Sequence, residues 1–195
     1  VTLTFAARER AFRLYRDRSD TRSAARVAVA LAGDYFSFKG DYTIARGWRQ
    51  RAHRLLEGLD ASPEAGWLAI VEAHSALEVE HAPAAAQTWS GQAAAAGRAL
   101  GLHDLEMLGL AYEGLALVHQ GRLGDGLRRL DEAGMAAVTG EMTGIDPVCT
   151  ACTCLIYACE RTRDFEQAAH WCATLKELAA RGSHQLALAL NRTHT

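Results

Sequence analysis

The five cysteines are the residues of this 195-residue chain whose spacing comes closest to a chemical motif. Cys149 and Cys152 lie three positions apart, so on one helix their thiolates could share a zinc ion, and a helix N-terminus would lower the pKa of both thiols. A complete site needs a second pair of ligands, for which His170 and Cys172 of the next helix are candidates. Cysteine is also a small side chain that packs well in helical cores. We therefore predict core packing and no metal site for the cluster Cys149, Cys152, Cys154, Cys159 and Cys172.

The other reactive residue types show no catalytic arrangement. None of the eight histidines belongs to an H-E-x-x-H motif, and no serine or cysteine stands in a recognisable arrangement with His and Asp. We predict that this segment is not an enzyme and uses no cofactor. The odd number of cysteines, gathered in one quarter of the chain, differs from a secreted disulfide framework and favours a cytoplasmic location. Two alternatives remain open: a metal- or redox-responsive module that uses the cysteines, and a small-molecule-binding helical-repeat protein.

The composition favours helices. Hydrophobic residues make up 49% of the chain, and 24 leucines and abundant alanines stand against 8 valines and 4 isoleucines. Alanine and leucine lose little entropy in a helix, whereas β-branched residues favour strands. The longest apolar stretches are shorter than the roughly 18 residues of a membrane span. We therefore expect an all-α protein that does not contact a membrane.

A turn sequence recurs at positions 40, 81, 121 and 163, at intervals of 41, 40 and 42 residues. Tryptophan stands eight residues after three of these positions, and alanine stands twelve residues after three of them. These residues are Trp48, Trp89, Trp171, Ala52, Ala93 and Ala133. Each unit is interpreted as two helices joined by the turn. The expected helices are 3–18, 24–39 with 42–58, 64–80 with 83–99, 104–119 with 123–138, and 147–162 with 165–181.

From this pattern we predict a right-handed α-solenoid of about ten helices stacked as antiparallel hairpins. Gly33 and Gly114, seven residues before the turn, should let neighbouring helices approach closely. Tyr42, Leu123 and Phe165 should fill the space between successive pairs. The chain is expected to be a single repeat domain from a longer protein. Its divisions are a half-repeat at 1–20, repeats at 21–60, 61–102, 103–143 and 144–182, and a half-repeat at 183–195.

The small residue of the first helix, the turn Gly40-Asp41-Tyr42-Thr43-Ile44-Ala45 and the alanine of the second helix together resemble the tetratricopeptide repeat. The resemblance covers residues 24–181. The chain departs from the family in two ways. Its units exceed the family's length of about 34 residues, and Pro83 replaces the aromatic residue in the second unit.

Three runs, at residues 7–16, 105–111 and 155–161, resemble the helical-repeat region of large actinobacterial LuxR-type transcriptional regulators. In that family the repeats lie between an upstream nucleotide-binding module and a C-terminal helix-turn-helix. The sequence given contains neither a Gly-x-x-x-x-Gly-Lys-Ser/Thr loop nor a recognition-helix segment. The resemblance therefore implies a central module for protein–protein interaction or effector sensing, with ATPase and DNA-binding activities outside it.

The tetratricopeptide resemblance also implies a concave groove lined by exposed positions of the first helices. A mixture of apolar, aromatic and charged side chains suits a protein or peptide partner, flanking domains of the same chain, or a small-molecule effector. The predicted groove-binding residues are Asp34, Phe38, Ser75, Glu78, Leu115, His119, Tyr157, Glu160 and Arg161.

Charge is unevenly distributed along the chain. Residues 1–60 carry 12 basic and 7 acidic side chains, whereas residues 61–120 carry 1 basic and 7 acidic. The arginines between Arg8 and Arg26 are interleaved with Glu9, Asp17 and Asp20, which is typical of a solvated helix face. Few aromatic residues are interleaved for stacking on bases. We predict no direct binding of nucleic acid by this segment.

Overall fold

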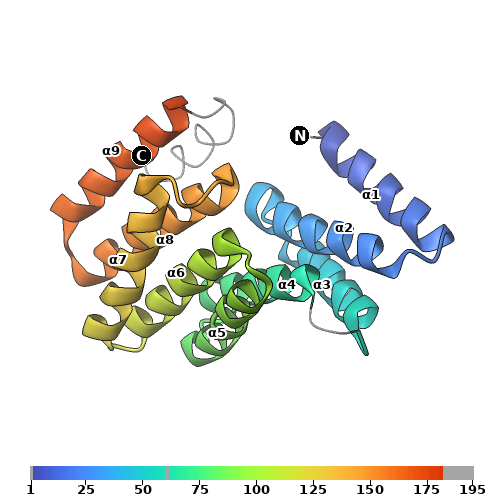
Figure 1. Cartoon of the computed structure of the whole chain (residues 1–195), viewed down its shortest axis with the longest axis horizontal. Coiled ribbons are helices and arrows are strands. Elements are labelled where there is room, and N and C mark those ends of the chain that lie inside the picture. Colours follow the sequence, from blue (N-terminus) through green and yellow to red (C-terminus); the bar gives the residue numbers. More distant parts are fainter. Residues whose placement is uncertain (1, 60–61, 182–195) are drawn as a thin grey trace. The chain divides into compact units, whose positions relative to one another are not determined.

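The computed structural model describes residues 2–59 and 62–181, and these residues form helices without any strand (Figure 1). The helices are α1 (Thr2–Asp17), α2 (Thr21–Asp34), η1 (Tyr35–Lys39), α3 (Tyr42–Leu56), α4 (Pro63–Glu78), α5 (Pro83–Leu100), α6 (His103–His119), α7 (Leu123–Thr139), α8 (Ile145–Thr162) and α9 (Phe165–Arg181). η1 is a π-helical segment that extends α2. The all-α prediction is confirmed. The half-repeat predicted at 183–195 lies outside the described residues.

The described helices begin and end within three residues of the predicted bounds, when α2 and η1 are taken together. Ser62 accepts a hydrogen bond from the backbone N–H of Ala65 and so caps α4 directly before Pro63. None of the described helices is both long enough and apolar enough to pass through a lipid bilayer.

The four predicted turn positions share one backbone conformation. Gly40, His81, Gly121 and Arg163 have positive φ angles of 62°, 50°, 80° and 59°. Glycine adopts this left-handed region without steric cost, whereas other L-residues do so at a cost of about 1–2 kcal/mol. The four predicted turn positions thus adopt the left-handed conformation even where glycine is absent, and Ser19, Gly58, Gly101 and Gly140 in the other turns adopt it as well.

The chain divides into two compact units, Val1–Glu72 and Ala73–Thr195, with the division inside α4. We call them the N-terminal unit and the C-terminal unit. In the N-terminal unit α2 packs against α1 and α3. Aromatic rings make up much of this core: Phe12 and Trp48 meet edge to face with ring centroids 4.9 Å apart, and Phe5 and Tyr35 do so at 4.8 Å.

One position of α2 is open. A Cβ atom placed on Gly33 would have no other atom within 4 Å. The residue lines an apolar hollow of about 400 Å³ between α2 and the first half of α4, opposite the side chains of Trp67 and Val71. The close helix approach predicted at Gly33 is therefore wrong, because side chains rather than a helix backbone face this stretch of α2.

In the C-terminal unit α6 contacts α5, α7 and α8 and is buried along most of its length. Here the helices approach through glycine. A Cβ atom on Gly114 would lie 2.7 Å from the carbonyl oxygen of Gly126 in α7, and one on Gly109 would lie 2.5 Å from the backbone nitrogen of Ala94 in α5. The close approach predicted at Gly114 is confirmed.

Three large residues that follow the turns are largely exposed, although the Tyr42 ring meets the Phe36 ring edge to face with centroids 5.1 Å apart. Tyr42, Leu123 and Phe165 are 51%, 46% and 66% exposed. Each is the first residue of its helix, and its side chain therefore projects from the helix end instead of the face that enters the core. The prediction that they fill the space between helix pairs is wrong. By contrast, Trp48 and Trp171 are buried as the register requires.

Candidate functional site

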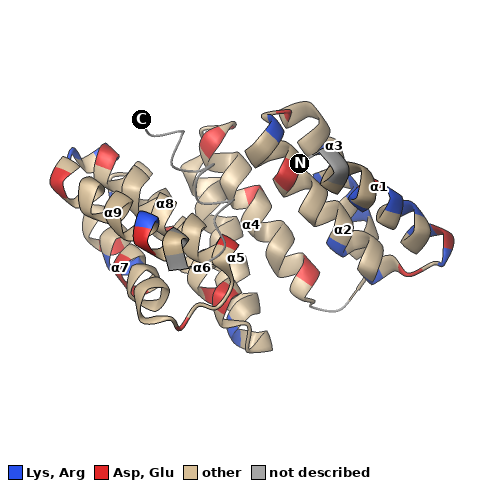
Figure 2. Cartoon of the chain, turned by 90° about the horizontal axis from the view of Figure 1, so that it is seen from above, with Lys and Arg blue, Asp and Glu red and all other residues tan. Residues whose placement is uncertain are grey.

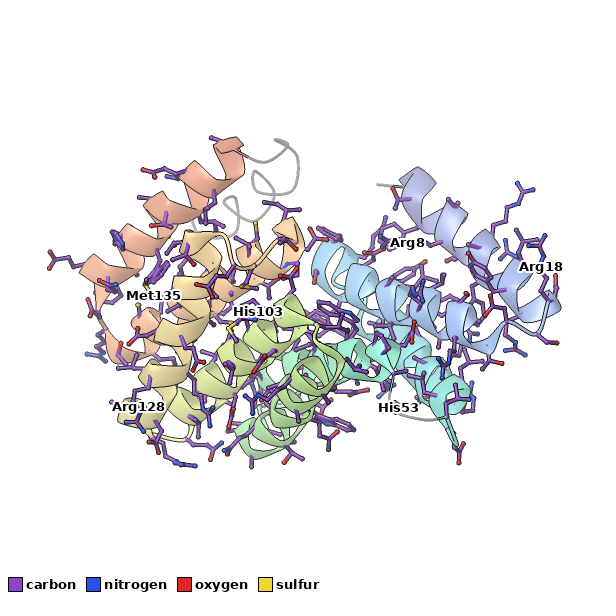
Figure 3. All side chains as sticks on the ribbon, viewed as in Figure 1. Arg8, Arg18, His53, His103, Arg128 and Met135 are labelled. Atoms are coloured by element: carbon purple, nitrogen blue, oxygen red, sulfur yellow. The ribbon has the colours of Figure 1, made fainter. Side chains whose placement is uncertain are left out.

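Two of the predicted groove residues belong to the N-terminal unit. Asp34, at the end of α2, forms an ion pair with Arg8 of α1, which is labelled in Figure 3. The Asp34 side chain is only 14% exposed, so its carboxylate joins two helices and is not available to a ligand. Phe38 of η1 is 45% exposed and remains available at the surface.

Two predicted groove residues of the C-terminal unit are buried rather than exposed. Leu115 is 1% exposed, because α5, α7 and α8 surround α6. Ser75 is 4% exposed, and its hydroxyl donates a hydrogen bond to Glu80 Oε1 at 3.1 Å. The prediction that these two side chains line an open groove is therefore wrong.

The other predicted groove residues of this unit gather from three helices. Glu78 ends α4, His119 ends α6, and Tyr157 and Arg161 lie in the C-terminal part of α8. Arg161 changes the pKa of His119, and Glu78 changes the pKa of Tyr157, as expected of charges that lie near one another. We name this group the α4–α6–α8 cluster; it consists of Glu78, His81, His119, Tyr157, Glu160 and Arg161.

Sequence reasoning misses one member of the cluster, His81. The charge of His81 affects the pKa of both Glu78 and His119, so it lies beside them. His81 is exposed and occupies the left-handed turn position where the first and third units have glycine. A histidine at a position that favours glycine is the signal in the sequence that could have identified it.

Burial disfavours the charged forms of three side chains of the cluster, those of Glu78, His119 and Tyr157. Burial raises the pKa of Glu78, and the charge of His81 opposes that shift. Burial lowers the pKa of His119, and the positive charges of Arg161 and His81 lower it further. His119 is therefore neutral at pH 7, with one ring nitrogen donating and the other accepting hydrogen bonds. Burial also raises the pKa of Tyr157, which keeps its hydroxyl proton.

A pair of neighbouring rings, one partly buried and one buried, lies next to the cluster. His74 of α4 and Tyr112 of α6 have ring centroids 5.6 Å apart. Burial lowers the pKa of His74 to about 4. It also raises the pKa of Tyr112 well above its usual value, and the negative charge of Glu78 adds to that shift. Both rings are thus uncharged at neutral pH.

The cluster can form hydrogen bonds and ion pairs but contains no activated nucleophile. His119 offers a neutral donor and acceptor, and Arg161 offers the planar set of N–H donors that matches carboxylates and phosphates. The Ser75 hydroxyl nearby is buried, and burial strongly raises the pKa of the Cys154 thiol. Such an arrangement suits the recognition of a polar or charged group.

The cysteines of α8 belong to the core. Cys149, Cys152, Cys154 and Cys159 are buried, which confirms the expected packing for these four, whereas Cys172 of α9 is only partly buried. Burial raises the pKa of Cys152 to about 12, and a thiol with a raised pKa is a poor nucleophile. Within residues 2–59 and 62–181, no three or more His, Cys, Asp and Glu side chains are grouped so that they could hold a metal ion.

Comparison of the chain with family models, with curated proteins and with solved structures finds no match.

Proposed function

We propose that this chain is a binding module that uses the α4–α6–α8 cluster to recognise a protein or peptide partner, with a small-molecule effector as the alternative ligand. One observation carries the proposal. Side chains from three helices gather into a group that presents hydrogen-bond donors, acceptors and an exposed guanidinium, whereas the nearby serine and cysteine are buried. The module is not an enzyme.

The proposed architecture is a right-handed α-solenoid of tetratricopeptide type. Its support is the recurrence of the left-handed turn at four positions and the packing of α2 on α3, α6 on α7 and α8 on α9 as consecutive pairs. In such an architecture the first helices of successive pairs supply the ligand-binding residues. Glu78, His119 and Arg161 come from the first helices α4, α6 and α8.

The proposed context is a cytoplasmic, actinobacterial transcriptional regulator of the LuxR type. Its support is the resemblance of residues 7–16, 105–111 and 155–161 to the repeat region of that family. A ligand at the cluster would favour one packing of α6 against α8, and flanking modules would respond to that change. A gene that encodes a nucleotide-binding module before these residues and a helix-turn-helix after them would support this context; other flanking modules would contradict it.

Selection of a random-peptide display library on the immobilised chain tests the binding proposal. We expect enriched peptides whose affinity falls by roughly tenfold or more in Arg161→Ala, because a charge-assisted hydrogen bond contributes about that much. Arg128→Ala is the matched control, since Arg128 is an exposed arginine of the same unit outside the cluster. Failure to enrich any peptide, or equal affinities for both variants, would contradict recognition of a peptide at the cluster.

An NMR titration tests the geometry of the cluster without any ligand. We expect the pKa of His119 to lie below the usual value of 6.5 and to rise in Arg161→Ala, because the variant removes a nearby positive charge. The same substitution at Arg128 should leave the pKa of His119 unchanged. If the pKa of His119 is the same in the parent chain and in Arg161→Ala, the two side chains are not neighbours.

A further inference from the structure

A basic hollow lies on α1 and α3 of the N-terminal unit. It has a volume of about 450 Å³ and is lined by Glu9, Phe12, Arg13, Arg16, Trp48 and Arg51. The rings of Phe12 and Trp48 are buried, at 8% and 7% exposure, and the arginines are exposed. The hollow therefore presents guanidinium groups above an aromatic floor. Figure 2 shows the basic residues of α1 in blue.

The aromatic floor holds two of these guanidinium groups in place. The Cζ atom of Arg51 lies 4.6 Å from the centroid of the Trp48 ring, and that of Arg16 lies 6.0 Å from the centroid of the Phe12 ring. A guanidinium that stacks on a ring is attracted by the ring's electron density and keeps its N–H groups available. These groups are thus partly ordered before any anion binds, which lowers the entropic cost of binding.

Six carboxylates of this unit are engaged in other contacts, and one of them, that of Glu9, also lines the hollow. Asp34, Glu64 and Glu72 pair with Arg8, Arg26 and Arg49. Asp20 and Asp41 accept hydrogen bonds at the starts of α2 and α3, and Glu9 accepts one from the Tyr35 hydroxyl. Within the part of the chain that the structure describes, Arg13, Arg16 and Arg51 form no ion pair.

A hollow in the C-terminal unit shows the opposite arrangement. It is lined by three arginines of α7 and its preceding turn, and all three are paired: Arg122 and Arg128 with Asp125 at 2.8 and 2.5 Å, and Arg129 with Glu113 at 3.5 Å. Exposed arginines of this chain therefore do form ion pairs where a carboxylate lies nearby. The excess positive charge is a particular property of the hollow on α1 and α3.

We propose that this hollow is a docking site for a carboxylate-rich peptide segment of a partner protein. The planar N–H fork of arginine matches a carboxylate in two parallel hydrogen bonds, and three unpaired forks in one hollow suit neighbouring Asp or Glu side chains. The observations favour a peptide over a nucleic acid. Single strands are held by bases stacked on exposed rings, whereas Phe12 and Trp48 lie beneath the guanidinium groups and are buried.

Fluorescence anisotropy of a labelled short poly-glutamate peptide tests this proposal. We expect salt-sensitive binding that weakens by roughly tenfold or more in the variant Arg13→Ala, Arg16→Ala, Arg51→Ala. The matched control removes the same number of charges from the paired hollow: Arg122→Ala, Arg128→Ala, Arg129→Ala. Its affinity should stay within about twofold of the parent chain. Circular dichroism checks that both variants stay folded, as expected for exposed side chains.

Three results would overturn the assignment. The first is the absence of binding at low salt. The second is an equal loss of affinity in both triple variants, which would show attraction by net charge alone. The third is tighter binding of a short oligothymidylate that depends on Arg13, Arg16 and Arg51, which would make the hollow a nucleic-acid site. Because the α4–α6–α8 cluster is intact in all variants, these results leave its proposed function untouched.

Discussion

Gly33 of α2 and Gly114 of α6 occupy the same position of the repeat, seven residues before the turn, but they have opposite surroundings. A Cβ on Gly33 meets nothing within 4 Å, whereas one on Gly114 meets the Gly126 carbonyl oxygen at 2.7 Å. The N-terminal unit packs aromatic rings together with buried alanines between its helices, whereas the C-terminal unit also brings helix backbones into direct contact at its glycines. The position of a residue in the repeat determines where it lies in its helical hairpin. It does not determine which neighbouring atoms pack against that residue.

The two candidate binding surfaces differ in a related way. In the N-terminal unit the aromatic core supports a rim of unpaired arginines. In the C-terminal unit the tightly packed α6 brings the ends of α4, α6 and α8 close enough for their charges to act on one another. Four changes test the comparison through stability, and each is measured as the free energy of unfolding in urea.

The largest expected effect is the loss of an aromatic residue from the N-terminal core. Trp48→Ala should lower the free energy of unfolding by about 3–5 kcal/mol, because it removes a ring that packs on Phe12 and leaves a cavity. Phe38→Ala is the control, since Phe38 is 45% exposed, and it should cost less than about 1 kcal/mol. Similar losses for the two variants would contradict an aromatic core centred on Trp48.

The second effect is a loss of stability in acid that originates in the C-terminal unit. The unfolded chain protonates His74 below pH 6.5, whereas the folded chain does so only near pH 4, so protons favour the unfolded state between these values. The free energy of unfolding should fall by about 2 kcal/mol more between pH 7 and pH 5 in the parent chain than in His74→Phe. Equal pH dependence of both chains would show that His74 titrates normally.

The third effect concerns the helix contact at Gly114. Gly114→Ala should lower the free energy of unfolding by about 1–3 kcal/mol, because the new methyl group meets the backbone of Gly126 and the side chain of Leu130. The intrinsic preference of alanine for helices is smaller than this clash. A more stable variant would show that α6 and α7 are separated more widely than the structure has them.

The features that the sequence predicted correctly are those decided within one helix or turn. The turns at Gly40 and Gly121, and the helices around them, follow from local backbone preferences and hydrophobic spacing. The features that it missed depend on neighbours. Whether Leu115 is exposed depends on α5, α7 and α8 together, and whether Gly33 is crowded depends on the side chains of α4.

The candidate site shows the same division between local and neighbour-dependent features. The register placed Glu78, His119 and Arg161 near helix ends, and the structure brings them together. His81 could not be assigned by the register of the first helices, because it lies in a turn outside them. Its left-handed backbone conformation turns the chain just after α4, and His81 lies beside Glu78 at the end of that helix.

The smallest expected effect has the opposite sign and uses the open glycine. Gly33→Ala should raise the free energy of unfolding by about 0.5–1 kcal/mol, because alanine favours the helix and its methyl group enters empty space. Gly47 of α3 is the matched control: its surroundings are equally open, and Gly47→Ala should give a similar gain. A gain at Gly47 together with a loss at Gly33 would mean that the hollow between α2 and α4 is closed in solution. The two glycines of the repeat, Gly33 and Gly114, would then be packed alike.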